Sequence, residues 1–150
     1  MKSAETRSKE LWKSGFYCAE SVLMAIAEHE GITSDLIPKI ATGFCSGLAR
    51  TGGMCGALTG GVLAANMIYG RNSPDESIEE NYAFVQDLIK SFEEKFGATE
   101  CIGLLNIDVR TKEGRAAYKE KGLWSTCRDF VEGTTSLVVS LLEKKRQLNG

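Results

Sequence analysis

The chain has 150 residues, a length typical of one domain with a hydrophobic core. Hydrophobic residues make up 43% of the sequence and charged residues 25%, which indicates a globular protein and excludes an intrinsically disordered one. The formal net charge of −2 provides no basic footprint for nucleic acid or for an anionic membrane surface.

The N-terminal segment is polar and charged, and it lacks the apolar core of a signal peptide. The most apolar run, residues 54–69, is too short and too rich in Gly, Thr and Asn to span a bilayer. We therefore expect a cytoplasmic protein without membrane insertion.

Helical periodicity dominates the chain, and neither period-two alternation nor an Asn-Gly hairpin occurs. The pattern predicts an all-α fold, a single-domain bundle of about five to seven helices. Six of the expected helices cover residues 3–13, 17–30, 35–48, 73–96, 100–105 and 125–147. A further helix is expected to begin within residues 52–61 and to end at residue 69, and one or two helical turns are expected near residues 115–121.

Two of these helices carry the clearest signals. The helix over 17–30 has an apolar face and stops at Gly31, while the helix over 73–96 starts with a Ser-Pro-Asp-Glu capping sequence and ends at Gly97. The second helix has an apolar face of helical spacing, which predicts core residues rather than a cofactor site. The face of the helix over 17–30 consists of Ala19, Val22, Leu23, Ile26 and Ala27. The face of the helix over 73–96 consists of Ile78, Tyr82, Val85, Leu88, Ile89, Phe92 and Phe96.

The sequence has five cysteines, an odd number that cannot pair completely. The reducing cytosol also disfavours a structural disulfide framework, so free thiols are expected. Any one of them could be a small buried hydrophobic residue. Four of them, however, fall at predicted helix N-termini, and the fifth, Cys45, falls inside a predicted helix. The four are Cys18, Cys55, Cys101 and Cys127.

The first turn of a helix presents unpaired backbone N–H groups and the positive end of the helix dipole. A thiolate there is stabilised and its pKa is lowered, and the thiolate is both the nucleophile and the metal ligand. The four positions therefore suit a site that holds negative sulfur, such as an iron–sulfur cluster. The sequence alone does not show that the four N-termini converge.

The segment GGMCGALTGG, residues 52–61, surrounds Cys55 with five glycines. Gly56 and Gly60 repeat at a spacing of four residues, which leaves a smooth helix face that another backbone can approach. Tight helix packing alone would explain them, or the approach could bring Cys55 to a cofactor, with Gly56 and Gly60 in its binding site. A phosphate loop is disfavoured because GxxxxGK[ST] is absent and no predicted strand precedes the segment.

The cysteine flanks resemble a known family. Cys18 in YCAESVL, Cys55 in CGALTG, Cys101 in ECIGLL and Cys127 in TCRDFV match in order the pattern of the C_GCAxxG_C_C family. Its members are expected to be redox-active, and they are similar to the C-terminal part of split-Soret cytochrome c, which is associated with an iron–sulfur site. The resemblance implies that these four cysteines are the redox-active or metal-ligand set. Cys45, in FCSGLAR, departs from a glycine-rich run in the family and could be inert or a fifth ligand.

The haem part of this resemblance does not transfer, because a c-type haem attachment site, CxxCH, is absent. The one histidine, His29, is expected to be solvated at a helix end rather than a ligand. No Ser–His–Asp set can be built around it, so hydrolytic chemistry has little support.

Three functional hypotheses stay open at this point. The first is an electron-transfer or redox-sensing protein with a [2Fe–2S] cluster on the four cysteines, with zinc less favoured because close CxxC pairs are absent. The second is a thiol–disulfide switch without metal, although a CxxC motif and a thioredoxin-like pattern are missing. The third is a helical binding module with inert cysteines. The redox partner is unknown, and a homodimer could form.

Overall fold

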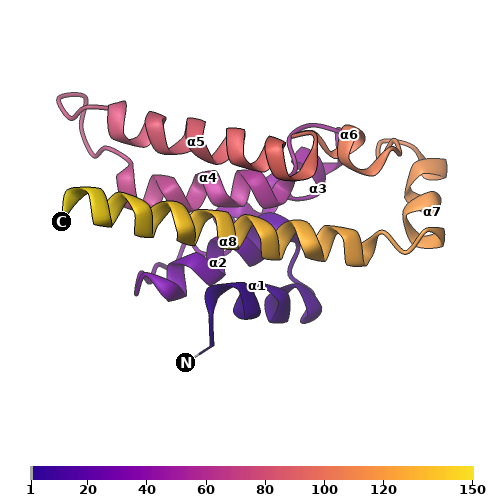
Figure 1. Cartoon of the computed structure of the whole chain (residues 1–150). Helices are drawn as coiled ribbons and strands as arrows, with labels where there is room; N and C mark the ends of the chain where they lie inside the picture. The colour runs from indigo at the N-terminus through magenta and orange to yellow at the C-terminus, as the bar shows by residue number, and fades with distance from the viewer. Residues whose placement is uncertain (1) are drawn as a thin grey trace.

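Helices supply the regular structure of residues 2–150, the part of the chain that the computed structural model describes, apart from one isolated bridge between Met54 and Glu100. The predicted all-α class is confirmed (Figure 1). The elements in order are α1 (Ala4–Lys13), α2 (Cys18–His29), the 3₁₀ helix η1 (Lys39–Phe44), α3 (Cys45–Arg50), α4 (Gly56–Tyr69), α5 (Glu79–Phe96), α6 (Cys101–Leu105), α7 (Lys112–Glu120) and α8 (Trp124–Asn149).

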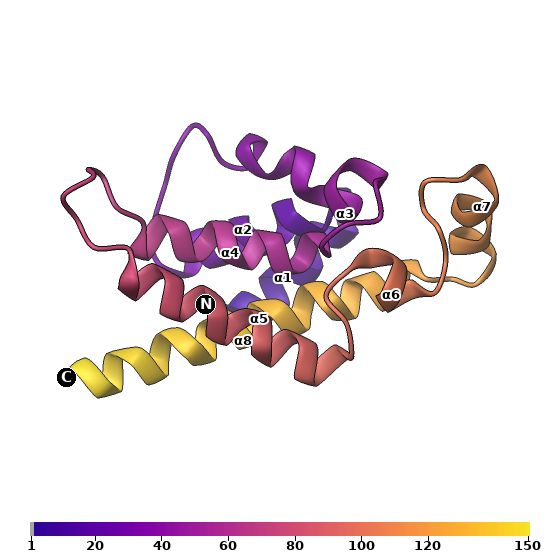
Figure 2. The ribbon, with the colours of Figure 1, turned by 90° about the horizontal axis from the view of Figure 1, so that it is seen from above.

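Helix α4 lies at the centre of the bundle, between α2 on one side and α5 and α8 on the other (Figures 1 and 2). Helix α1 covers α2 and α8, while α3, α6 and α7 gather at one end of the molecule. The predicted apolar face of α2 is fully buried against this core. The largest fully buried side chains are Phe92, Leu23, Ile26, Leu58, Leu88 and Leu142.

The predicted helix over residues 35–48 is wrong. The structure has turns up to Pro38, the short helix η1, and then α3, in which residues 46–50 have left-handed backbone angles. Pro38 disfavours the helical conformation of the residue before it, and Gly43 and Gly47 weaken a regular helix further. The local sequence therefore supports two tight turns instead of one continuous helix.

The left-handed turn of α3 contains four residues with side chains: Ser46, Leu48, Ala49 and Arg50, whose φ angles lie between 55° and 68°. Each such residue costs roughly 1–2 kcal/mol relative to a right-handed one. The N–H group of Gly53 donates to the Gly47 carbonyl at 3.1 Å, and the Thr51 hydroxyl donates to the Leu48 carbonyl at 2.9 Å. These bonds offset part of the cost of the turn.

The predicted start of α5 at Ser73-Pro74 is also wrong, because α5 begins at Glu79. The Ser73–Ser77 segment is a turn in which the Glu76 carboxylate accepts from the Asn72 N–H at 3.0 Å. The predicted end at Gly97 is confirmed, with a φ of 90°. On the predicted core face, Tyr82 is an exception that is 53% exposed.

At the C-terminal end, α7 is longer than the one or two helical turns expected near residues 115–121, and α8 begins at Trp124, one residue before its predicted start. The Thr111 hydroxyl caps α7 by accepting from the Gly114 N–H at 2.9 Å.

Within the described residues, no helix combines the length and the apolar character that a membrane crossing requires.

Substituting Gly60 tests the contact between α4 and α2. A Cβ atom there would lie 2.7 Å from the carbonyl oxygen of Ala19 and 2.9 Å from its Cα, both backbone atoms. Gly60→Ala should therefore lower the free energy of unfolding by about 1–3 kcal/mol, although alanine has the higher helix propensity. Chemical denaturation measures the change. Gly43→Ala, where nothing lies within 4 Å of the added atom, should stay within about 0.5 kcal/mol of the wild type.

Candidate functional site

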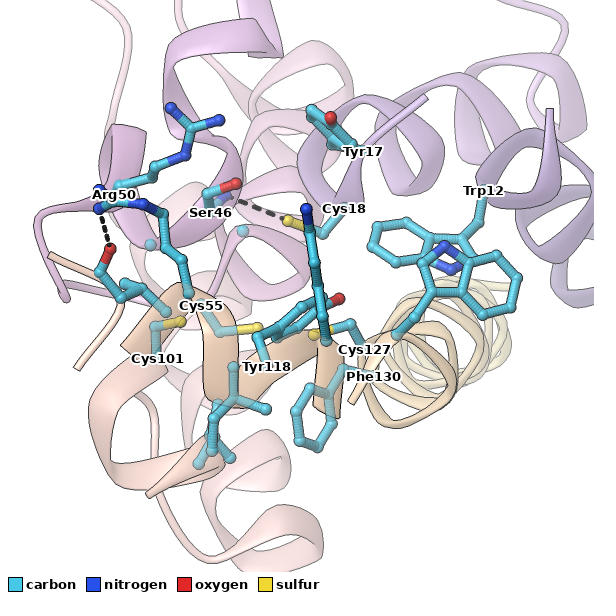
Figure 3. A pocket seen from close by; sticks show the side chains of 18 residues that line it. Trp12, Tyr17, Cys18, Ser46, Arg50, Cys55, Cys101, Tyr118, Cys127 and Phe130 are labelled. Atoms are coloured by element: carbon cyan, nitrogen blue, oxygen red, sulfur yellow. Dashed lines mark hydrogen bonds between the residues drawn. The ribbon is translucent and has the colours of Figure 1, made fainter. Parts of the chain in front are cut away.

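The end of the bundle where α3, α6 and α7 gather contains a pocket of about 330 Å³ (Figure 3). The four cysteines predicted as a set all line it, although they come from four different helix ends. The convergence that the sequence could not show is therefore present in the fold. These cysteines are Cys18, Cys55, Cys101 and Cys127.

Cys18 is the first residue of α2, and its side chain is half-buried in the pocket wall. The backbone N–H of Ser46, in the left-handed turn, donates to its sulfur at 3.5 Å. A Cβ atom on Gly56 would lie 2.2 Å from the same sulfur. The place of the Cys18 sulfur therefore depends on Gly56 having no side chain.

Cys55 and Cys101 are brought together by a short backbone pairing. The Cys55 N–H donates to the Thr99 carbonyl, and the Cys101 N–H donates to the Gly53 carbonyl, both at 2.8 Å. These two bonds flank the Met54–Glu100 bridge. The pairing joins the segment before α4 to the segment before α6, so the two buried thiols begin their helices side by side.

Cys127 lies on α8, and its backbone N–H already donates to the Leu123 carbonyl at 2.9 Å. It is the fourth residue of the helix, so the expectation of an unpaired first-turn N–H at this cysteine is wrong. Its side chain lines the pocket together with that of Tyr118 on α7.

Burial raises the pKa values of three of the four pocket thiols. The pKa of Cys55 rises to about 12 and that of Cys127 to about 11, with loss of solvent as the main cause, and burial also raises the pKa of Cys101. The expected lowering by helix N-termini is wrong for these three thiols. At Cys55 the N–H groups of Ala57 and Leu58 do oppose the shift, but desolvation outweighs them.

Positive charge surrounds the pocket. Arg50, Arg115 and Lys119 line it, and no Asp or Glu is among its lining residues. Arg115 is held in place because its Nη1 donates to the carbonyls of Val109 and Arg110 at 3.0 and 3.1 Å. None of the three cations takes part in an ion pair within the described part of the chain. The pocket is therefore suited to negative charge.

Aromatic side chains form another wall of the pocket, and the sequence analysis missed them as site residues. The rings of Trp12 and Trp124 lie 5.7 Å apart, and Tyr17, Tyr118 and Phe130 also line the pocket. The Trp12 indole N–H is buried without a hydrogen-bond partner. No local motif marks these residues, because α1, α7 and α8 bring them together only in the folded chain.

The two glycines predicted at the site have different places. Gly56 lines the pocket beside Cys18, whereas Gly60 lies one turn further along α4 against the backbone of Ala19. Gly47, which was not predicted, also lines the pocket, and a Cβ atom there would lie 2.7 Å from Cβ of Cys101. The exposed His29 lies outside this pocket, beside Glu30.

The thiols surround the pocket without forming a compact cage. Among residues 2–150, no three His, Cys, Asp or Glu side chains lie close enough together to hold a metal ion in the arrangement of the structure. A single zinc ion needs four ligands within roughly 2.3 Å of one centre.

Comparison with known proteins agrees with the arrangement of the cysteines. Residues 16–141 match the model of the family described as "Putative redox-active protein (C_GCAxxG_C_C)". An uncharacterized protein from Archaeoglobus fulgidus is 27% identical over 153 residues, covering 95% of each chain. No solved structure gives a significant match.

The raised thiol pKa values predict a loss of stability at high pH. An unfolded cysteine ionises near pH ~8.5, whereas Cys127 and Cys55 keep their protons until about 11 and about 12 in the fold. The unfolded state therefore binds fewer protons between these values, and the free energy of unfolding should fall as pH rises from about 8.5 towards 11. Each thiol contributes up to about 3 kcal/mol over this window.

Urea denaturation of the reduced, metal-free protein at about pH 8 and about pH 10 measures this effect. Cys127→Ala should show a smaller decrease than the wild type, since it lacks one of the shifted groups. An equal decrease in both proteins would contradict the assignment of the effect to this thiol.

Proposed function

Because the chain belongs to the C_GCAxxG_C_C family, we propose that it is an electron-transfer protein that holds an iron–sulfur cluster, of the [2Fe–2S] type, in the pocket. The ligands would be the four family cysteines. The observation that carries the proposal is that thiols from four separate helix ends line one cavity. Four cysteine thiolates are the common ligand set of such clusters.

The charge and shape of the pocket support this choice. A cluster with four thiolate ligands carries net negative charge, and the pocket has three lining cations and no lining carboxylate. Gly47 and Gly56 leave space next to Cys101 and Cys18, where any side chain would collide with the cysteine atoms. The residues present therefore fit an anionic sulfur cluster.

The protein residues have separable roles in this proposal. When bound, the cluster supplies one-electron chemistry. Since burial raises the pKa values of Cys55, Cys101 and Cys127, these thiols stay protonated in the metal-free protein and must release their protons on metal binding. The Ser46 N–H donates a hydrogen bond to the Cys18 sulfur and so orients it, and the Tyr118 side chain lines the pocket together with Cys127.

The same pKa values favour a metal ligand set over thiol–disulfide exchange among the pocket cysteines. Exchange requires a thiolate as the attacking group. A buried thiol that titrates near 11 or 12 is almost fully protonated at neutral pH, as at Cys127 and Cys55. A metal ion displaces that proton directly, so burial is a smaller obstacle to metal binding than to nucleophilic attack.

Anaerobic reconstitution with iron and sulfide tests the proposal. The wild-type protein should become brown and contain two iron and two acid-labile sulfide ions per chain, which colorimetric assays measure. Single Ser substitutions at Cys55, Cys101 and Cys127 should each reduce the bound iron, because each removes one ligand. Cys45→Ser is the matched control and should retain wild-type iron content. A colourless wild-type protein without iron after reconstitution would refute the proposal.

The pocket cations should set the reduction potential. Arg50 lines the pocket with an exposed side chain and forms no ion pair within residues 2–150. Its positive charge favours the reduced, more negative state of the site. Arg50→Gln should therefore make the potential more negative by on the order of tens of millivolts, measured by redox titration. Lys90→Gln, an equal charge change on the exposed face of α5 outside the pocket, should cause a smaller shift.

A further inference from the structure

The fifth cysteine, Cys45, lies directly behind Cys18. Its Cα is 3.1 Å from the position that a Gly56 Cβ would occupy, and the Cys18 sulfur is 2.2 Å from that same position. Ser46, the next residue in the chain, donates its N–H to the Cys18 sulfur. The two cysteines are therefore neighbours in the fold, although 27 positions separate them in the sequence.

The two thiols differ in their access to solvent. Cys18 is half-buried and lines the pocket, so a small molecule that enters the pocket can reach it. Cys45 is 4% exposed, does not line the pocket, and directs its thiol towards the Ala41 carbonyl at 3.7 Å. This arrangement places a reachable thiol in front of a protected one, as in proteins with an attacking and a resolving cysteine.

We propose that Cys18 and Cys45 form a reversible disulfide when a peroxide enters the pocket. The Cys18 thiolate attacks one peroxide oxygen, the O–O bond breaks, and Cys18 becomes a sulfenic acid while hydrogen peroxide releases hydroxide, which takes up the Cys18 proton to give water. The sulfenic acid then condenses with the Cys45 thiol: the sulfenic oxygen takes up the Cys45 proton and leaves as a second water while the S–S bond forms, so a free Cys45 thiolate is not required. The two thiols lose two electrons in total, and the peroxide gains them.

The local structure supports Cys18 as the thiol that reacts first. It begins α2, a helix of 12 residues, and it accepts the hydrogen bond from Ser46. Both features hold the Cys18 sulfur at the pocket wall, where a peroxide can reach it. The other pocket thiols Cys55 and Cys101 are 7% and 9% exposed, so a small molecule in the pocket reaches them less easily than it reaches Cys18.

The disulfide would also regulate the pocket, and this consequence rests on the proposed iron–sulfur function. A Cys18 sulfur bonded to Cys45 cannot ligate iron, so oxidation would remove one of the four ligands. The protein could therefore hold a cluster or this disulfide, but not both. Peroxide-treated protein should then take up less iron than reduced protein, and dithiothreitol should restore the uptake.

The disulfide is tested on the reduced, metal-free full chain. Hydrogen peroxide is added, free thiols are blocked with N-ethylmaleimide, and the protein is digested without reductant for mass spectrometry. We expect a peptide pair linked through Cys18 and Cys45 that dithiothreitol separates. In Cys45→Ala, dimedone should label the Cys18 sulfenic acid about tenfold more than in the wild type, because the resolving thiol is missing.

Cys127→Ala is the matched control, since it removes another half-buried pocket thiol and should leave the Cys18–Cys45 link intact. A wild-type map in which Cys18 is linked to a different cysteine, or to none, would overturn the proposal even if a variant failed to fold. The iron content is not used in this experiment. A protein that forms the disulfide but binds no iron would refute the proposed function alone, and the reverse result would refute the disulfide alone.

Discussion

The close approach of α4 to α2 is the contact on which the pocket depends. Gly60 allows the helix backbones to meet at the Ala19 carbonyl, and Gly56, one turn earlier, allows the Cys18 sulfur to occupy the place of a side chain. The same rigid helix carries Cys55 at its start, so its position relative to α2 fixes two of the four thiols at once. Gly56 and Gly60 thus determine where the Cys18 and Cys55 sulfurs lie, although neither glycine has a side chain that could bind a ligand.

Burial and helix dipoles act in opposite directions on these sulfurs, and burial dominates at Cys55 and Cys127. The site therefore stores protons when it lacks a metal, and the arginine and lysine side chains around it supply the compensating charge for the ionised form. Two kinds of cysteine chemistry, metal ligation and disulfide formation, are therefore proposed for the same pocket. The buried pocket thiols are proposed as cluster ligands, whereas the half-buried Cys18 and its neighbour Cys45 are proposed to form a disulfide with peroxide.

Much of the fold follows from sequence patterns that have a local cause. The apolar face of α2, the glycine that ends α5 and the cysteines at the starts of α2 and α6 could all be predicted, because each reflects one helix alone. The turn over residues 45–50 could not, since right-handed helical propensity gives no indication of left-handed angles at Leu48 and Ala49. The sequence carries no sign of the aromatic wall of the pocket, and it leaves open whether Cys55 and Cys101 meet. Both features depend on packing between distant segments.

The left-handed turn over residues 46–50 affects how readily the pocket wall opens. Ser46, Gly47 and Arg50 form part of its wall, and the side-chain-bearing residues of the turn are held in a conformation that free peptides avoid. Unwinding this turn would return that conformational free energy, which lowers the cost of opening the pocket at this point. The wall beside Cys18 and Cys45 is consequently where we expect the enclosure to open to the surrounding solution.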